Sequence, residues 1–226
     1  MKKWVVMASL MILGGVMNAC AMGGASWKEE VLLHDGTKMV VERSQTYDGY
    51  SEPASTERSL AKEEWIFRVP GSKREVVWKS DYSRPPEGDS LMLLQLNFMN
   101  GVPYIATTPA GCLSYNHWKR PNPPYIFFKY DGKGWQQIPI SEFPIVFKNS
   151  NVVVGRPDKN HQEGLLRVDT IKEDNRLLEP YLKEIMREPL KPGSIGVSCP
   201  ELIYYKGAWI GPGDSIGRRM MEHLSK

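Results

Sequence analysis

The sequence predicts a mainly β protein of antiparallel hairpins, arranged as a meander, a sandwich or a propeller-like sheet, with two short helices near the carboxyl terminus. Short apolar or β-branched runs alternate with glycine-containing turns along most of the chain. Four of these turns centre near residues 35, 71, 100 and 132, a spacing of roughly 30 residues. Neither helical pattern lies in a strand–helix–strand alternation, which argues against a parallel α/β fold.

Six pairs of runs are predicted to form hairpins. Turns such as Asp35-Gly36 and Asn100-Gly101 supply the positive φ that a tight hairpin turn requires. The sixth pair flanks a long polar loop and is the weakest. The pairs are Val31–Leu33 with Lys38–Val41, Trp65–Val69 with Glu75–Trp78, Leu91–Phe98 with Val102–Ala106, Tyr125–Tyr130 with Trp135–Ile138, Leu202–Tyr205 with Ala208–Ile210, and Val152–Val154 with Leu165–Val168.

Two helices are predicted after these strands. Apolar residues recur at helical spacing from Leu177 to Met186, and Pro180 places the start of the regular part close to itself. A second helix is predicted over Ser215–Leu224, capped by Asp214 or Ser215.

The first 19 residues have the pattern of an export signal. Lys2 and Lys3 precede an uncharged apolar run, Trp4–Met17, and small residues follow. The segment Val16-Met17-Asn18-Ala19-Cys20 resembles the lipobox of bacterial lipoproteins. That resemblance implies cleavage before Cys20, a diacylglycerol on its sulfur and an acyl chain such as palmitate on its amino group. An ordinary signal peptide with an incidental Cys20 is the alternative.

The lipoprotein resemblance also implies an address. Ala21 follows Cys20, where an aspartate often marks retention in the inner membrane. The anchor is therefore expected in the outer membrane, with the protein on its periplasmic face. Residues 20–26 are predicted to form a lipidated tether, and residues 27–226 a single β-rich periplasmic domain. Several acyl chains hold such a domain on a bilayer almost permanently.

Removal of the signal changes the charge balance. The whole chain has 226 residues and a net charge of +3, with 29 basic and 26 acidic residues. Residues 1–19 contain two lysines and no acidic residue, so the remaining 207 residues carry 27 basic and 26 acidic side chains. No basic run stands out, and the composition therefore argues against a nucleic-acid-binding protein.

The cysteine count is odd, and a lipidated Cys20 would leave two cysteines. Cys112 and Cys199 are expected to form a disulfide in an oxidising compartment. The alternatives are two separate buried thiols, or a thiol nucleophile at Cys112 with His117 near it in sequence.

Two short motifs resemble hydrolase signatures. Gly88-Asp89-Ser90-Leu91 matches the nucleophile block of GDSL-type esterases, and Asp158-Lys159-Asn160-His161 supplies an Asp-x-x-His. However, the first motif follows a proline-rich turn and leads into a strand, unlike that family, so a serine esterase using Ser90 and His161 is only an alternative function. Gly213-Asp214-Ser215 resembles the serine motif of chymotrypsin-like proteases, and helix capping explains it better. The four histidines are scattered, no metal-ligand spacing occurs, and no cofactor is implied.

Aromatic side chains are concentrated between Cys112 and Trp135, around the proline-rich segment 119–124. Trp, Tyr and Arg dominate binding hot spots, so this segment is a candidate surface for a protein or a glycan. The alternative is that the aromatic residues fill the core between hairpins. The candidate partner-binding residues are Tyr115, His117, Trp118, Arg120 and Tyr125, with Trp118 and Arg120 expected to be the exposed pair.

The body of the chain adds a second resemblance. Segments 27–36, 110–115 and 125–132 are similar to a group of proteobacterial periplasmic lipoproteins that carry no established catalytic residues. Lipoproteins of this size and pattern include immunity proteins that act against secreted antibacterial effectors such as phospholipases. The resemblance implies a non-enzymatic lipoprotein that binds a protein partner. A structural or envelope-assembly lipoprotein is an alternative.

Overall fold

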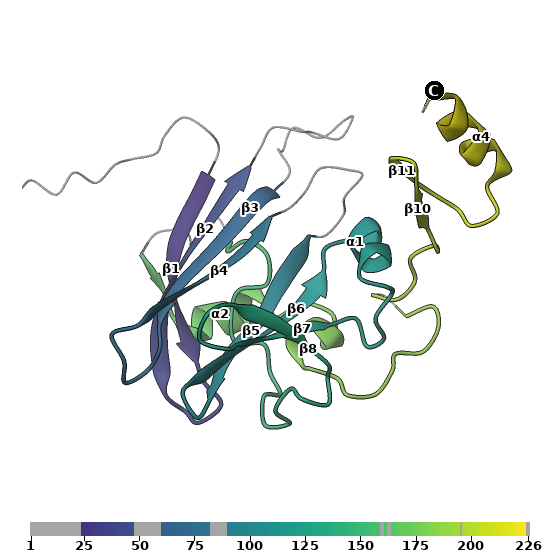
Figure 1. Cartoon of the computed structure of the whole chain (residues 1–226). Helices are drawn as coiled ribbons and strands as arrows, with labels where there is room; N and C mark the ends of the chain where they lie inside the picture. Colours follow the sequence, from purple (N-terminus) through teal and green to yellow (C-terminus); the bar gives the residue numbers. More distant parts are fainter. Residues whose placement is uncertain are drawn as a thin grey trace, which may run out of the picture.

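The protein is a β-sandwich with a C-terminal extension (Figure 1). The computed structural model describes residues 24–47, 60–81, 90–158, 161, 164–194 and 196–224. Two sheets, of five and four strands, share one apolar core. The mainly β, antiparallel fold class is confirmed, and a sandwich is the arrangement found.

The first sheet has the strand order β4-β3-β2-β1-β9. Its first four strands form an antiparallel meander, and the two-residue β9 adds to β1 in parallel. Because β1 begins at Gly24, the boundary expected at Trp27 between tether and domain lies inside a strand. The strands are β1 (Gly24–Leu32), β2 (Lys38–Tyr47), β3 (Leu60–Arg68), β4 (Glu75–Asp81) and β9 (Leu165–Leu166).

The second sheet is a meander of β5 (Leu91–Met99), β6 (Val102–Pro109), β7 (Ile126–Tyr130) and β8 (Trp135–Ile138). Its first turn has φ values of 52° at Asn100 and 75° at Gly101. Two successive positive φ values are what a tight two-residue hairpin of the right twist requires. Five of the six predicted hairpins are confirmed: β1–β2, β3–β4, β5–β6, β7–β8 and β10–β11.

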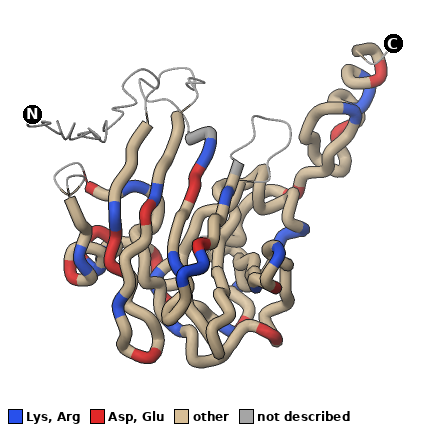
Figure 2. Tube along the Cα trace, turned by 60° about the vertical axis from the view of Figure 1, so that its left-hand side comes forward, with Lys and Arg blue, Asp and Glu red and all other residues tan. Residues whose placement is uncertain are grey.

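The second sheet is buried on both faces. One face meets the first sheet in a core that includes Trp65 and Trp78 opposite Leu96 and Phe128. The other face is covered by residues 143–147 and 181–186. The first sheet instead exposes its outer face, where Lys28 pairs with Glu42 and Lys79 with Glu64 across neighbouring strands. Figure 2 shows basic and acidic residues interspersed in this part of the chain.

The sixth predicted hairpin is wrong. Residues 152–154 form no strand, although Val152 and Val153 are buried. Their backbone groups form hydrogen bonds with side chains and not with a neighbouring strand. Asn175 donates to the Val152 carbonyl and accepts from the Val154 amide, and Glu29 accepts from the Val153 amide. The apolar run therefore reflects burial alone.

The helices are shorter and more numerous than predicted. The helix expected over 177–186 is reduced to α3 (Pro180–Lys183), because residue 184 turns to extended backbone and bridges Asn149. Sequence reasoning missed α1 (Cys112–His117) and α2 (Val168–Asp174). The last helix, α4 (Ser215–Leu224), is confirmed. Among the described residues, no helix is long and apolar enough to cross a membrane.

The C-terminal arm, residues 196–224, projects from the sandwich (Figure 1). It consists of the hairpin β10 (Ile203–Tyr205) and β11 (Ala208–Ile210), followed by α4. The Asp214 carboxylate accepts hydrogen bonds from the amides of residues 216 and 217, which is the cap expected for this helix.

A charged cluster is buried inside the first sheet. Arg43 is 2% exposed, and its guanidinium donates to Glu63 at 2.6 Å, to Glu29 at 3.4 Å and to the carbonyls of Val153 and Gly155. The guanidinium carbon also lies 5.0 Å from the ring centres of Trp27 and Trp65 on the neighbouring strands. Residues 152–156 thus pack against this cluster and supply two of its hydrogen-bond acceptors.

Glu29 should make the stability of the fold depend on pH. Its burial raises its pKa above the usual value of 4.5, against the opposing charge of Arg43. The Glu29 carboxyl therefore stays protonated in the folded chain at pH values where it is already ionised in the unfolded chain. The free energy of unfolding should then fall as pH rises above 4.5 through the raised pKa, and Glu29→Gln should remove this fall. Urea unfolding of the parent chain and of Glu29→Gln at several pH values above 4.5 checks this prediction. If the free energy of unfolding depends on pH equally in both, the prediction is wrong.

The outer edge of β4 is partly covered by the other sheet. The Trp135 indole of β8 donates a 2.9 Å hydrogen bond to the Val77 carbonyl, and Arg74 reaches the Gly132 carbonyl in the β7–β8 turn. These contacts tie the two sheets together along one side of the sandwich.

Candidate functional site

A disulfide attaches the C-terminal arm to the sandwich. Cys112 is the first residue of α1, and Cys199 lies four residues before β10. Their Cα atoms are 5.3 Å apart and the sulfurs are bonded, which confirms the predicted pair. The bond fixes the base of the arm beside α1.

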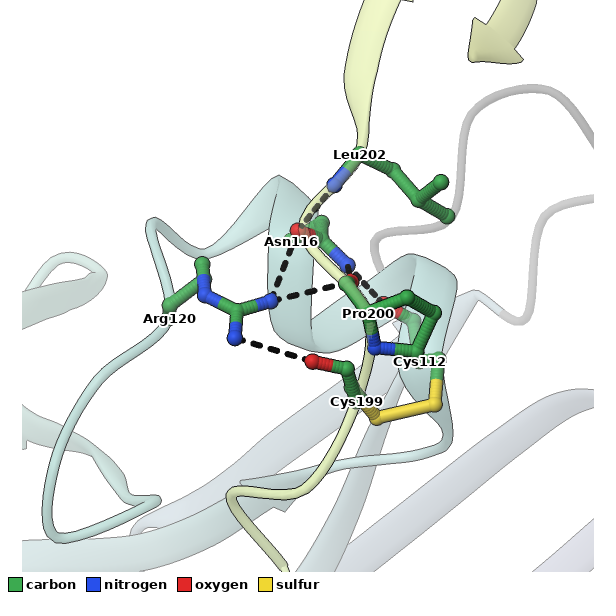
Figure 3. The surroundings of a disulfide bond; sticks show 6 residues. All are labelled: Cys112, Asn116, Arg120, Cys199, Pro200 and Leu202. Atoms are coloured by element: carbon green, nitrogen blue, oxygen red, sulfur yellow. Dashed lines mark hydrogen bonds between the residues drawn. A yellow bond between two sulfur atoms is a disulfide. The ribbon is translucent and has the colours of Figure 1, made fainter. Parts of the chain in front are cut away.

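Two polar side chains reinforce this attachment (Figure 3). The Asn116 amide donates to the Pro200 carbonyl at 2.9 Å and accepts from the Leu202 amide at 2.9 Å. Arg120 donates to the carbonyls of Cys199 and Pro200 and to the Asn116 oxygen. The backbone groups of 199–202 are therefore held by side chains of α1 and of the turn that follows it.

That turn has an unusual backbone. Lys119 and Arg120 have φ values of 65° and 54°, and two consecutive non-glycine residues in this region are uncommon. The Arg120 amide bonds back to the Tyr115 carbonyl at 2.8 Å, and its guanidinium lies 5.1 Å from the Tyr115 ring centre. The turn thereby directs Arg120 across the end of α1 to the arm.

A groove of about 800 Å³ lies between α1 and the hairpin of the arm. On the hairpin, Tyr204 and Trp209 pair across the strands with ring centres 5.5 Å apart. Successive residues of a strand point to opposite faces, so this aromatic pair lies on the face away from Ile210, which packs against α4. The groove is lined by Asn116, His117, Lys119, Arg120, Glu201, Leu202, Ile203, Tyr204 and Trp209.

The lining is suited to binding a protein segment. It combines two exposed or half-exposed aromatic rings with the cationic side chains of Lys119 and Arg120, against one acidic residue, Glu201. Aromatic residues and arginine contribute most of the binding energy at protein interfaces. The arrangement favours a segment that offers apolar side chains together with carboxylates.

The five residues proposed as partner-binding fall into three groups, and the expected exposed pair, Trp118 and Arg120, is half-buried. Tyr115 and Tyr125 are each 4% exposed and belong to the interior. The Tyr125 hydroxyl donates to the Tyr181 carbonyl at 2.7 Å, and burial raises its pKa to about 12. His117 is exposed and Arg120 half-buried, and both line the groove, whereas Trp118 is half-buried against the core beside Phe128.

Ser90 and His161 occupy different surroundings. Ser90 is buried one residue before β5, and its carbonyl accepts from the Ala110 amide and the Ser114 hydroxyl. The His161 Nδ1 instead lies 2.7 Å from the Asp174 carboxylate on α2, a contact that raises the pKa of the histidine. Both residues are described, and no hydrogen bond joins them.

Several sequence predictions concern parts of the chain outside the described residues. These are the signal segment, the lipidation site Cys20 with the first residues of the tether (20–23), residues 88–89 of the esterase-like motif, and residues 159–160 of the Asp-x-x-His motif. Within the described ranges, no group of three or more potential metal-ligating side chains occurs.

Sequence reasoning missed the arm's contribution to the site. Tyr204 and Trp209 were assigned to a hairpin, but nothing in their spacing brings them close to residues 116–120, more than 80 positions earlier. The predicted Cys112–Cys199 bond was the available signal, because it places the segment before β10 against the residues after Cys112.

No family model, curated protein or solved structure matches this chain.

Proposed function

We propose that this chain is a non-enzymatic lipoprotein of the outer membrane, anchored through Cys20 on the periplasmic face, which binds a protein partner in the groove beside α1. The observation that carries this proposal is the groove itself, where an aromatic pair on the arm faces cationic side chains of a strained turn. The lipobox-like sequence before Cys20 supports the anchor.

The partner is a secreted antibacterial effector that the protein neutralises as an immunity protein. The similarity of segments 27–36, 110–115 and 125–132 to periplasmic lipoproteins supports this assignment. Rigid placement of the groove also supports it, because a preorganised surface loses little conformational entropy on binding. The disulfide together with the Asn116 and Arg120 hydrogen bonds supplies that rigidity.

Substitutions in the groove should weaken the complex with the proposed effector. Tyr204→Ala removes an exposed ring that lines the groove, and we expect about a tenfold to thirtyfold loss of affinity, as for a hot-spot residue. Lys119→Glu reverses a charge in the lining of the same groove and should weaken binding to a similar extent. Isothermal titration calorimetry with the purified effector measures both.

Two variants outside the groove serve as controls. Lys73→Glu makes the same charge reversal at the exposed β3–β4 turn, and Leu177→Ala removes an apolar side chain that is 84% exposed. Both should bind as the parent chain does. Equal affinity of the groove variants and the parent would exclude this groove as the binding site. In a separate assay, hydrolysis of generic esters that Ser90→Ala abolishes would favour the esterase alternative.

A further inference from the structure

Helix α4 exposes one apolar face. Ile216, Met220 and Leu224 follow one another at four-residue spacing, and they are 65%, 60% and 76% exposed. Residues at this spacing lie on one side of a helix. Side chains of this size rarely form an uncovered stripe unless another surface contacts them.

The opposite side of α4 is fixed to the hairpin of the arm. On the flank between the two sides, Gly217 packs so closely on Ile210 and Asp214 that a β-carbon would collide there. The Glu222 carboxylate accepts from the Tyr205 hydroxyl at 3.1 Å, and the Arg218 guanidinium lies 5.5 Å from the Tyr205 ring centre. The helix is therefore held with its apolar face turned away from the hairpin and from the groove.

Cationic side chains lie on the other sides of the helix and on the hairpin. Arg219 flanks the apolar face, whereas Arg218 and Lys206, from the adjacent β10–β11 turn, lie near the Tyr205 ring on the hairpin side. The acidic groups nearby have local partners: Asp214 caps the helix, and Glu222 bonds Tyr205. An apolar stripe on a helix whose other sides carry arginines is the pattern of a helix that lies in the interface of an anionic bilayer.

The position of α4 in the molecule agrees with such a surface. Strand β1 begins, and the C-terminal arm projects, at the same end of the sandwich in two views 60° apart (Figures 1 and 2). Only four residue steps separate Cys20 from Gly24, so the connection can span at most about 14 Å. A lipid on Cys20 would hold this end of the sandwich, and with it α4, close to the membrane.

We propose that the apolar face of α4, formed by Ile216, Met220 and Leu224, docks on the surface of an anionic phospholipid bilayer at the end of the molecule that carries the lipid anchor. This inference rests on the anchor in the proposed function, and it does not depend on the identity of the protein partner. The helix and the anchor form two points of attachment, which orient the groove relative to the membrane. The protein partner then meets a groove of fixed orientation, on the opposite face of the hairpin from α4.

The test uses the full chain, purified from membranes and reconstituted into vesicles of phosphatidylethanolamine with phosphatidylglycerol. Flotation with the vesicles reports the anchor, and hydrogen exchange of the α4 amides reports docking. We expect these amides to exchange about tenfold more slowly than in the same chain on neutral phosphatidylcholine vesicles. The double variant Ile216→Ser/Met220→Ser should still float but should lose the slow exchange.

A matched control removes apolar groups of similar exposure elsewhere. Ile145 and Leu177 are 73% and 84% exposed, and the double variant Ile145→Ser/Leu177→Ser should keep the slow exchange in α4. A chain that floats while α4 exchanges equally on both kinds of vesicle overturns the docking and leaves the anchor intact. A chain that does not float overturns the anchor, and the docking with it. Slow exchange that depends on protein density or on added effector, and not on lipid charge, assigns the face to a second copy or to the protein partner and overturns the proposal.

Discussion

Replacing Arg43 by methionine should lower the free energy of unfolding by about 3 to 5 kcal/mol, as expected when one partner of a buried ion pair is removed. Methionine fills a similar volume, but it leaves the carboxylates of Glu29 and Glu63 without their cation. The carbonyls of Val153 and Gly155 lose a donor as well. An unpaired buried charge costs far more than the interaction that was lost.

The neighbouring exposed ion pair provides the control for this prediction. Lys28 and Glu42 lie 2.8 Å apart on the outer face of the same sheet, and more than half of each side chain is exposed. Lys28→Met should change stability by less than about 1 kcal/mol. Urea unfolding at neutral pH, followed by tryptophan fluorescence, compares the two variants. Equal losses of stability would show that the buried cluster contributes no more than a surface pair.

Removing the disulfide should lower the free energy of unfolding by about as much as Arg43→Met does. The bond joins residues 87 positions apart, and loop-closure entropy predicts about 4 to 5 kcal/mol for a loop of this length. In the double variant Cys112→Ser/Cys199→Ser, the arm is held to the sandwich by the Asn116 and Arg120 hydrogen bonds and by its chain connection. We therefore expect the arm to detach before the sandwich unfolds.

Hydrogen exchange distinguishes local detachment from general loss of stability. Amides of β10, β11 and α4 should exchange much faster in the double variant, while those of β5 and β6 should change less. The single variant Asn116→Ala keeps the disulfide and should cost about 1 to 3 kcal/mol, because it removes the hydrogen bonds that the Asn116 side chain makes to the Pro200 carbonyl and the Leu202 amide. Unchanged exchange in the arm of the disulfide variant would show that the hydrogen bonds alone hold it.

The sequence predicted those elements whose signals are local. Glycine-containing turns between short apolar runs located five hairpins, and an aspartate before a helical pattern located α4 and its cap. The disulfide followed from the cysteine count. In each case the residues that determine the structure lie within a few positions of one another, or, for the disulfide, are the two cysteines that remain when Cys20 is assigned to the lipid.

The errors occurred where distant side chains decide the local structure. Residues 152–154 have the composition of a strand, but Glu29 and Asn175 supply their hydrogen bonds. The buried cluster was also missed, although it has a sequence signal. Arg43 is two residues from Val41, so it shares the inward face of its strand, and the same alternation places Glu29 beside Val31.

The contact between Trp135 and Val77 also bears on self-association. The outer edge of a sheet offers unpaired carbonyl and amide groups to which a strand of another molecule can add. On β4, the Trp135 indole occupies the Val77 carbonyl, and on the opposite edge of the sheet β9 pairs with Lys28 and Glu29 of β1. The Trp135 ring at the β4 edge and the short strand β9 at the β1 edge thus occupy backbone groups to which a strand of another molecule could otherwise add. Such intermolecular strand pairing is a first step of aggregation.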